Sequence, residues 1–132
     1  MTAPDVGILL DIDREYREKA ASGVLRKIAP SRYNSEHSAW LPVLHTRFGP
    51  WRFTALYSNT SRAHELHRTH DWVVICFDDE QHDDGQFTVV TERRGDLAGR
   101  RVVRGREPEC ATHYRALARV SSLEPSLSAS DG

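Results

Sequence analysis

The chain has 132 residues, of which 39% are hydrophobic and 28% charged, and its formal net charge is −1. This length fits one domain with its own core and excludes two, and a charge near zero excludes a global attraction to nucleic acid or membrane. No apolar run approaches the roughly eighteen residues of a membrane span, and no basic segment precedes one at the N-terminus. We therefore predict a cytoplasmic protein without a signal peptide or a transmembrane helix.

A helix is predicted over residues 5–22, because apolar residues recur there every three or four positions. Asp5 suits the start of this helix as a capping residue, and Gly23 suits its end. Residues 24–37 contain a proline and many polar turn formers, so we expect a loop that packs a few apolar side chains onto the core.

Five strands are predicted after this loop, over residues 39–46, 51–58, 72–77, 86–92 and 100–104. Apolar and polar residues alternate along 51–58, as they do in a strand with one buried face. The segment 72–77 is apolar throughout, which favours a position at the centre of the sheet. Between these two strands, Asn59 begins a short helix that is predicted to reach about His67.

Glu107 begins a C-terminal helix, with Pro108 in the first turn, where its missing N–H costs nothing. From Ser121 onward the chain is rich in serine, and residues 121–132 are predicted to form a disordered tail. The order of elements predicts a single α+β domain over residues 1–120. Its sheet is expected to be mixed or antiparallel with about five strands, and its helices N-terminal, middle and C-terminal.

Three histidines, His64, His67 and His70, stand three residues apart. Imidazoles at this spacing share a helix face and could bind a transition metal. The sequence lacks the paired cysteines or the His-Glu-x-x-His helix that usually accompany zinc. Histidines at this spacing more often lie on a solvated helix face than bind a metal. We therefore predict no metal and no other cofactor.

The segment 78–84, which reads DDEQHDD, carries five carboxylates and no cation apart from a histidine. It lacks the alternating acids and central glycine of a calcium-binding loop, so a solvated loop between strands is favoured over a cation site. Cys110 and His113 are also three residues apart, yet a pair without an orienting acid is weak support for a nucleophile. A restriction-enzyme type of nuclease uses two acids and a lysine at the ends of adjacent strands. The only lysines in the sequence, Lys19 and Lys27, lie outside any predicted strand, which argues against this chemistry.

The strongest functional signal is the segment 93–106, which holds six arginines against one aspartate. In an extended strand Arg100 and Arg104 share a face, so two or three guanidinium groups could follow a phosphate backbone. The predicted nucleic-acid-binding residues are Arg93, Arg94, Arg100, Arg101, Arg104 and Arg106. The alternative is an edge strand that charge protects from aggregation. Arginine outnumbers lysine sixteen to two, which indicates either codon bias or selection for bidentate anion binding.

Two other hypotheses stay open. A small hydrolase or nuclease, with or without a metal, would use His45, His64 and His70 together with Asp71, because these polar groups are expected near the ends of adjacent strands. Of these, His45, His64 and Asp71 are the candidate catalytic residues. A protein-interaction module would instead use the acidic segment 78–84 to dock a basic partner.

The strings AWLPVLHT, FTALYSNTSRAHEL, THDWVVI and TVVTERRGDLAGRRVVRGREPEC resemble the C-terminal region of bacterial helix-hairpin-helix DNA-binding proteins, a group loosely related to family X DNA polymerases. The opening LLDIDREYREKAASGVLRKIAPSRYN is similar to the segment that leads into that region. The resemblance therefore spans about residues 8–115 and covers most of the chain.

This resemblance implies a compact accessory domain in DNA metabolism, whose partner is DNA or a DNA-binding protein. The sequence contains neither the DNA-gripping hairpin module of that group nor the paired strand aspartates that hold the polymerase metals, so polymerase activity is not implied. The positions that the matching strings would transfer are Trp40, His45, Trp51, Asn59, His64, Asp71, Trp72, Arg100, Arg101 and Arg104.

Overall fold

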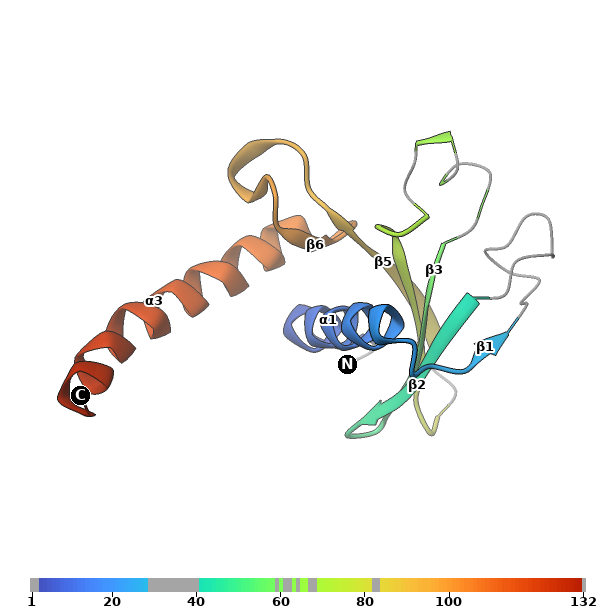
Figure 1. Ribbon diagram of the computed structural model, residues 1–132, viewed down its shortest axis with the longest axis horizontal. Coiled ribbons are helices and arrows are strands. Elements are labelled where there is room, and N and C mark those ends of the chain that lie inside the picture. The colour runs from blue at the N-terminus through green and yellow to red at the C-terminus, as the bar shows by residue number, and fades with distance from the viewer. Residues whose placement is uncertain are drawn as a thin grey trace.

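The computed structural model describes residues 3–28, 41–58, 60, 63, 65–66, 69–81 and 84–131, with side chains as far as Val120. The described elements form two layers, with helices on one face of a sheet (Figure 1). The helices are α1 (Val6–Ser22), the 3-10 turn η1 (Gly95–Leu97) and α3 (Glu107–Asp131). The strands are β1 (Lys27–Ile28), β2 (Leu41–Phe48), β3 (Trp51–Tyr57), β4 (Val73–Asp78), β5 (Asp84–Thr91) and β6 (Arg101–Val103).

The sheet has six strands, and each pairs antiparallel with its neighbours in the sequence. This confirms the predicted α+β class, and of the two sheet forms that the sequence left open, mixed or antiparallel, the structure has the antiparallel one. The additional strand is β1, which lies inside residues 24–37, the segment that was expected to be a loop. Its two residues pair with Leu41 and Pro42 of β2. A two-residue turn joins β2 to β3, and Gly49 adopts a left-handed φ of 58° there, which suits glycine.

Helix α1 ends as its sequence predicts. The side chain of Asp5 accepts a hydrogen bond from the N–H of Gly7, and Gly23 closes the helix with a φ of 77°. Tyr16 projects from the buried face, where its hydroxyl donates to the Pro42 carbonyl at 2.7 Å and accepts from the Tyr57 N–H at 2.9 Å. One side chain therefore links α1 to β2 and β3, and burial raises its pKa.

The main core lies between the sheet and the helices. Trp51, Phe53 and Ala55 face α1 from β3, as the alternation of that segment predicts. Strand β4 has Val73, Val74 and Ile75 buried in succession, which confirms its predicted place inside the sheet. On the opposite face Leu56 and Val74 are buried too, so the central strands carry buried side chains on both faces of the sheet.

The structure describes too little of residues 59–68 to test the predicted middle helix. Pro108 occupies the first turn of α3, as predicted, and α3 leads away from the sheet (Figure 1). This helix includes residues 121–131, for which no side chain is described, and the predicted disorder of that tail stays a prediction. No described helix combines the length and the apolar composition that crossing a bilayer requires.

Candidate functional site

Arg101 lies inside a network that joins β6 to α1. Its guanidinium donates to the Asp13 carboxylate at 2.8 and 3.1 Å and to the Asp71 carboxylate at 2.9 Å. It also donates to the Thr91 hydroxyl at 3.1 Å and to the carbonyls of Asp71 and Val89 at 2.6 and 3.2 Å. All three nitrogens are engaged and the side chain is only 13% exposed, so the expectation that Arg101 contacts phosphate is wrong.

Asp13 is the centre of this network on the helix side. Its side chain is 1% exposed and also accepts from Arg17 Nε at 3.1 Å. A buried charge that loses its partner costs about 3–5 kcal/mol, so the network holds α1 on the sheet. The sequence carried a signal that we missed, because Asp13 stands one helical turn after Leu9 and before Tyr16, on the buried face of α1.

Arg104 and Arg106 are exposed or partly exposed, but carboxylates pair with both. Arg104 donates to Glu92 at 3.3 Å and to Glu107 at 2.9 Å. Arg106 forms a bidentate pair with Glu109, and this hydrogen bonding lowers the pKa of the Glu109 carboxyl. The local positive charge of these two arginines is therefore largely neutralised, which weakens their predicted role as phosphate contacts.

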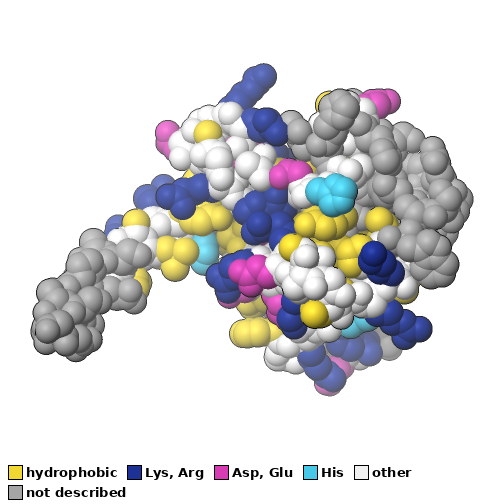
Figure 2. Space-filling model, viewed as in Figure 1, with side chains coloured by type: hydrophobic (Ala, Val, Ile, Leu, Met, Phe, Trp, Pro, Cys, Tyr) yellow, Lys and Arg dark blue, Asp and Glu magenta, His cyan; other side chains and the backbone are white. Residues whose placement is uncertain are grey.

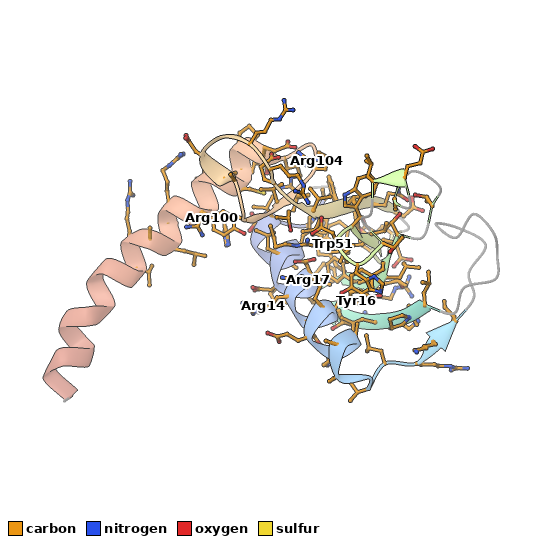
Figure 3. All side chains as sticks on the ribbon, turned by 45° about the horizontal axis from the view of Figure 1, so that its top comes forward. Arg14, Tyr16, Arg17, Trp51, Arg100 and Arg104 are labelled. Atoms are coloured by element: carbon orange, nitrogen blue, oxygen red, sulfur yellow. The ribbon has the colours of Figure 1, made fainter. Side chains whose placement is uncertain are left out.

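The other three arginines of the basic segment are exposed on the connection between β5 and β6. Arg100 lies near the start of α3 (Figure 3). Its guanidinium is 4.8 Å from the centroid of the Tyr114 ring, a contact that leaves its N–H groups able to donate. Within the described part of the chain, no carboxylate pairs with the side chains of Arg93 or Arg94. Figure 2 shows Lys and Arg side chains both around this connection and on other parts of the visible face.

The connection that carries these arginines is hydrogen-bonded internally. Glu92 and Gly99 close its base, with Gly99 N–H donating to the Glu92 carbonyl at 2.8 Å and Glu92 N–H donating to the Arg100 carbonyl at 2.9 Å. Gly95 and Gly99 adopt left-handed φ angles of 77° and 85°, which turn the chain on either side of η1. The three guanidinium groups thus project from an ordered turn.

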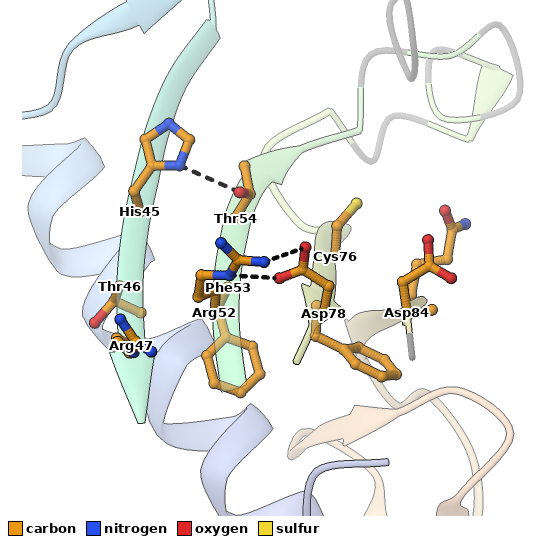
Figure 4. Close-up of a pocket in the computed structure, with 12 residues that line it drawn as sticks. His45, Thr46, Arg47, Arg52, Phe53, Thr54, Cys76, Asp78 and Asp84 are labelled. Atoms are coloured by element: carbon orange, nitrogen blue, oxygen red, sulfur yellow. Dashed lines mark hydrogen bonds and ion pairs between the residues drawn. The ribbon is translucent and has the colours of Figure 1, made fainter. Parts of the chain in front are cut away.

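A second candidate site is a groove on the face of the sheet turned away from α1 (Figure 4). It encloses about 710 Å³ and crosses four strands, β2 to β5. We call it the sheet groove and define it by the side chains of His45, Arg47, Arg52, Thr54, Cys76, Asp78, Asp84 and Gln86. Its floor is Thr54 and Cys76, because the two central strands carry small side chains at this level.

Four charged residues form one row across the groove, in the order Arg47, Arg52, Asp78 and Asp84. Arg52 and Asp78 make a bidentate ion pair in the middle, at 3.0 and 3.2 Å. At each end a like charge stands directly opposite, an arrangement that destabilises a sheet. Arg47 reaches Glu80 at 3.3 Å, whereas Asp84 is exposed and has no described partner.

The residues predicted for a hydrolase do not converge. His45 lies in the sheet groove, where its Nδ1 is 3.2 Å from the Thr54 hydroxyl. Asp71 lies on the helix side of the sheet, where it accepts from Arg101 and, at 2.6 Å, from the Thr91 hydroxyl. The expectation that His45 and Asp71 form one catalytic site is therefore wrong, and His64 lies outside the described residues.

Other side chains with potential chemistry have structural partners. Cys110 is buried with its Sγ accepting from the Val103 N–H at 3.3 Å, and burial raises the pKa of this thiol, which disfavours a nucleophile. His70 is exposed, with its ring 5.5 Å from that of Tyr57. Trp51 packs in the core rather than on a binding surface. Within the described ranges, no three His, Cys, Asp or Glu side chains lie together as metal ligands would. Trp40, Asn59, His67 and Asp83 lie outside those ranges.

Comparisons of the chain with protein-family models, with curated proteins and with solved structures find no match. The resemblance to the C-terminal region of helix-hairpin-helix DNA-binding proteins therefore stays a prediction. The charged side chains that the described fold leaves unpaired are therefore the main indication of function.

Proposed function

We propose that this domain binds nucleic acid through backbone phosphates at the β5–β6 connection, using Arg93, Arg94 and Arg100. One observation carries the proposal. Of six arginines in a short segment, three are engaged by carboxylates, and the other three, which are exposed and pair with no described carboxylate, stand together on one ordered turn. Unpaired guanidinium groups retain the N–H donors that phosphate oxygens accept.

Binding of this kind is electrostatic and does not read bases. Each phosphate that an arginine neutralises adds about 0.9 to the salt dependence of binding for duplex DNA and about 0.7 for a single strand. Three arginines therefore predict a slope of roughly 2–3 in a plot of the logarithm of affinity against that of salt. The affinity is expected to vary little with sequence, because phosphate contacts carry no base information.

A triple variant with Arg93, Arg94 and Arg100 changed to glutamine tests the proposal. Its matched control changes Lys19, Arg26 and Lys27 to glutamine. These residues lie in the last turn of α1, just before β1 and in β1, so the control removes the same charge away from the β5–β6 connection. Fluorescence anisotropy with labelled DNA of about 20 nucleotides, from about 50 to 200 mM salt, measures affinity and slope. We expect the Arg93, Arg94 and Arg100 variant to lose affinity and salt dependence, and the control to keep the affinity and the salt dependence of the parent protein.

Two outcomes would contradict the proposal. If the parent protein shows no salt-dependent binding to single-stranded or duplex DNA or RNA, the exposed arginines do not serve a nucleic acid. If both triple variants weaken binding equally, net charge rather than this turn is responsible. Binding only in the presence of a second, DNA-binding protein would favour the protein partner that the sequence also suggested.

A further inference from the structure

The sheet groove has a chemistry that phosphate binding at the β5–β6 connection does not use. Its charged row is positive on β2 and β3 and negative on β4 and β5, with the order Arg47, Arg52, Asp78 and Asp84 fixed by strand pairing. We propose that the sheet groove binds an extended peptide segment of a partner protein that carries one acidic and one basic side chain on the same face.

The hollow itself follows from side-chain size. Thr54 and Cys76 form the floor on the two central strands, and the longer side chain of His45 stands beside them on β2 (Figure 4). On the other side, strand pairing places Gln86 of β5 next to Cys76. The volume of about 710 Å³ lies within the range of small-ligand and peptide pockets. The thiol and the hydroxyl of the floor and the imidazole of His45 beside it offer hydrogen bonds to a peptide backbone.

The two outer charges of the row are the ones that a ligand can satisfy. Arg52 and Asp78 already neutralise each other, so Asp84 faces an occupied carboxylate and Arg47 faces an occupied guanidinium. The contact of Arg47 with Glu80 is single, at 3.3 Å, and both side chains are more than half exposed. Such a pair contributes little and can exchange for a ligand carboxylate. The Asp84 carboxylate is available to a ligand cation.

Spacing selects the ligand. Neighbouring strands lie about 4.8 Å apart, so three intervals separate the backbones of β2 and β5 by about 14 Å. An extended peptide rises about 3.3 Å per residue, so side chains four residues apart share a face at about 13 Å. A free amino acid is far too short to reach both ends. A nucleic acid would meet Asp78 and Asp84 with like charge, which disfavours it.

Peptides of five residues with blocked termini test the proposal. The bipolar peptide has glutamate first and lysine fifth, with alanine and glycine between. The controls have two glutamates, two lysines, or glutamate and lysine adjacent, so that the charges project to opposite faces. Chemical-shift titration of the whole chain is expected to show saturable binding of the bipolar peptide only, with shifts at His45, Cys76 and Gln86.

Variants then assign the two ends. Arg47→Gln and Asp84→Asn are each expected to weaken the bipolar peptide about three- to fivefold, as loss of one exposed ion pair would. Asp84→Lys makes both ends positive, and the preference should move to the peptide with two glutamates. Arg93→Gln should leave the titration unchanged, which separates this site from the phosphate site.

Equal binding of all four peptides would overturn the proposal, and so would the absence of saturable binding. The same holds if the Asp84→Lys protein keeps the preference of the parent. Failure here would leave DNA binding at the β5–β6 connection unaffected, because no residue is shared between the two sites.

Discussion

Replacing Arg101 with alanine is expected to destabilise the protein far more than replacing its neighbour Arg100. Arg101 bonds two carboxylates, a hydroxyl and two carbonyls, and one of the carboxylates, on Asp13, is 1% exposed. Removing one member of such a buried pair costs about 3–5 kcal/mol, because the other charge is left without a partner. A domain of this size is stable by only about 5–15 kcal/mol, so the variant loses a large part of its stability.

Arg100→Ala is the matched control. It removes the same kind of side chain one position earlier, but that side chain is exposed, and among the described residues its one side-chain contact is with the Tyr114 ring, a contact worth about 0.5–1 kcal/mol. Urea denaturation followed by circular dichroism measures both free energies of unfolding. The double variant Asp13→Ala with Arg101→Ala completes a cycle, and its loss should be smaller than the sum of the two single losses.

An Arg101→Ala variant whose free energy of unfolding lies within about 1 kcal/mol of the parent value would refute the structural role of Arg101, since a buried pair that loses one partner costs more. This role is also refuted if the losses of the two single variants simply add, because Asp13 and Arg101 would then act independently. Either result would return Arg101 to the group of residues available to an external anion.

Two further predictions concern the core and the C-terminal helix. Tyr16→Phe removes the hydroxyl that serves β2 and β3, and leaving a part-buried N–H and carbonyl without that partner is expected to cost about 1–3 kcal/mol in urea denaturation. The Glu109 carboxyl, with its pKa lowered by the hydrogen bond from Arg106, should titrate by NMR below the usual glutamate value of 4.5 and return to it in Arg106→Gln. Because the folded pKa is depressed, the stability from this pair is present above that value and is lost as the pH falls through the folded pKa.

The sequence predicts those parts of the fold that depend on neighbours in the chain. Asp5 and Gly23 bound α1 because capping is a local interaction, and the alternation from Trp51 onward identifies the face that packs on the helix. Strand β1 was missed because its two residues carry no periodic pattern, and only pairing with β2 makes them a strand. Local pattern therefore fails where a distant partner supplies the structure.

The arginine segment shows the same division within one strand. The sequence predicts that Arg100 and Arg104 share one face of the strand, and the same alternation places Arg101 on the opposite face. It could not reveal that Asp13, 88 residues away, and Asp71, 30 residues away, would meet Arg101 on that face. The row in the sheet groove was half predictable, since a two-residue turn pairs Arg47 with Arg52, whereas the longer β4–β5 connection hides its register.

The structure separates the arginines whose guanidinium geometry is used in the fold from those for which it is not. At Arg52, Arg101 and Arg106 the planar guanidinium makes two parallel bonds to one carboxylate, and an ammonium group could not reproduce this. At Arg93 and Arg94 no described contact requires a guanidinium, so the fold gives no reason for arginine there. Either codon usage or an external bidentate acceptor accounts for those two positions. Lysine at both positions distinguishes the two causes, because it retains the charge but weakens binding only where the guanidinium geometry is used.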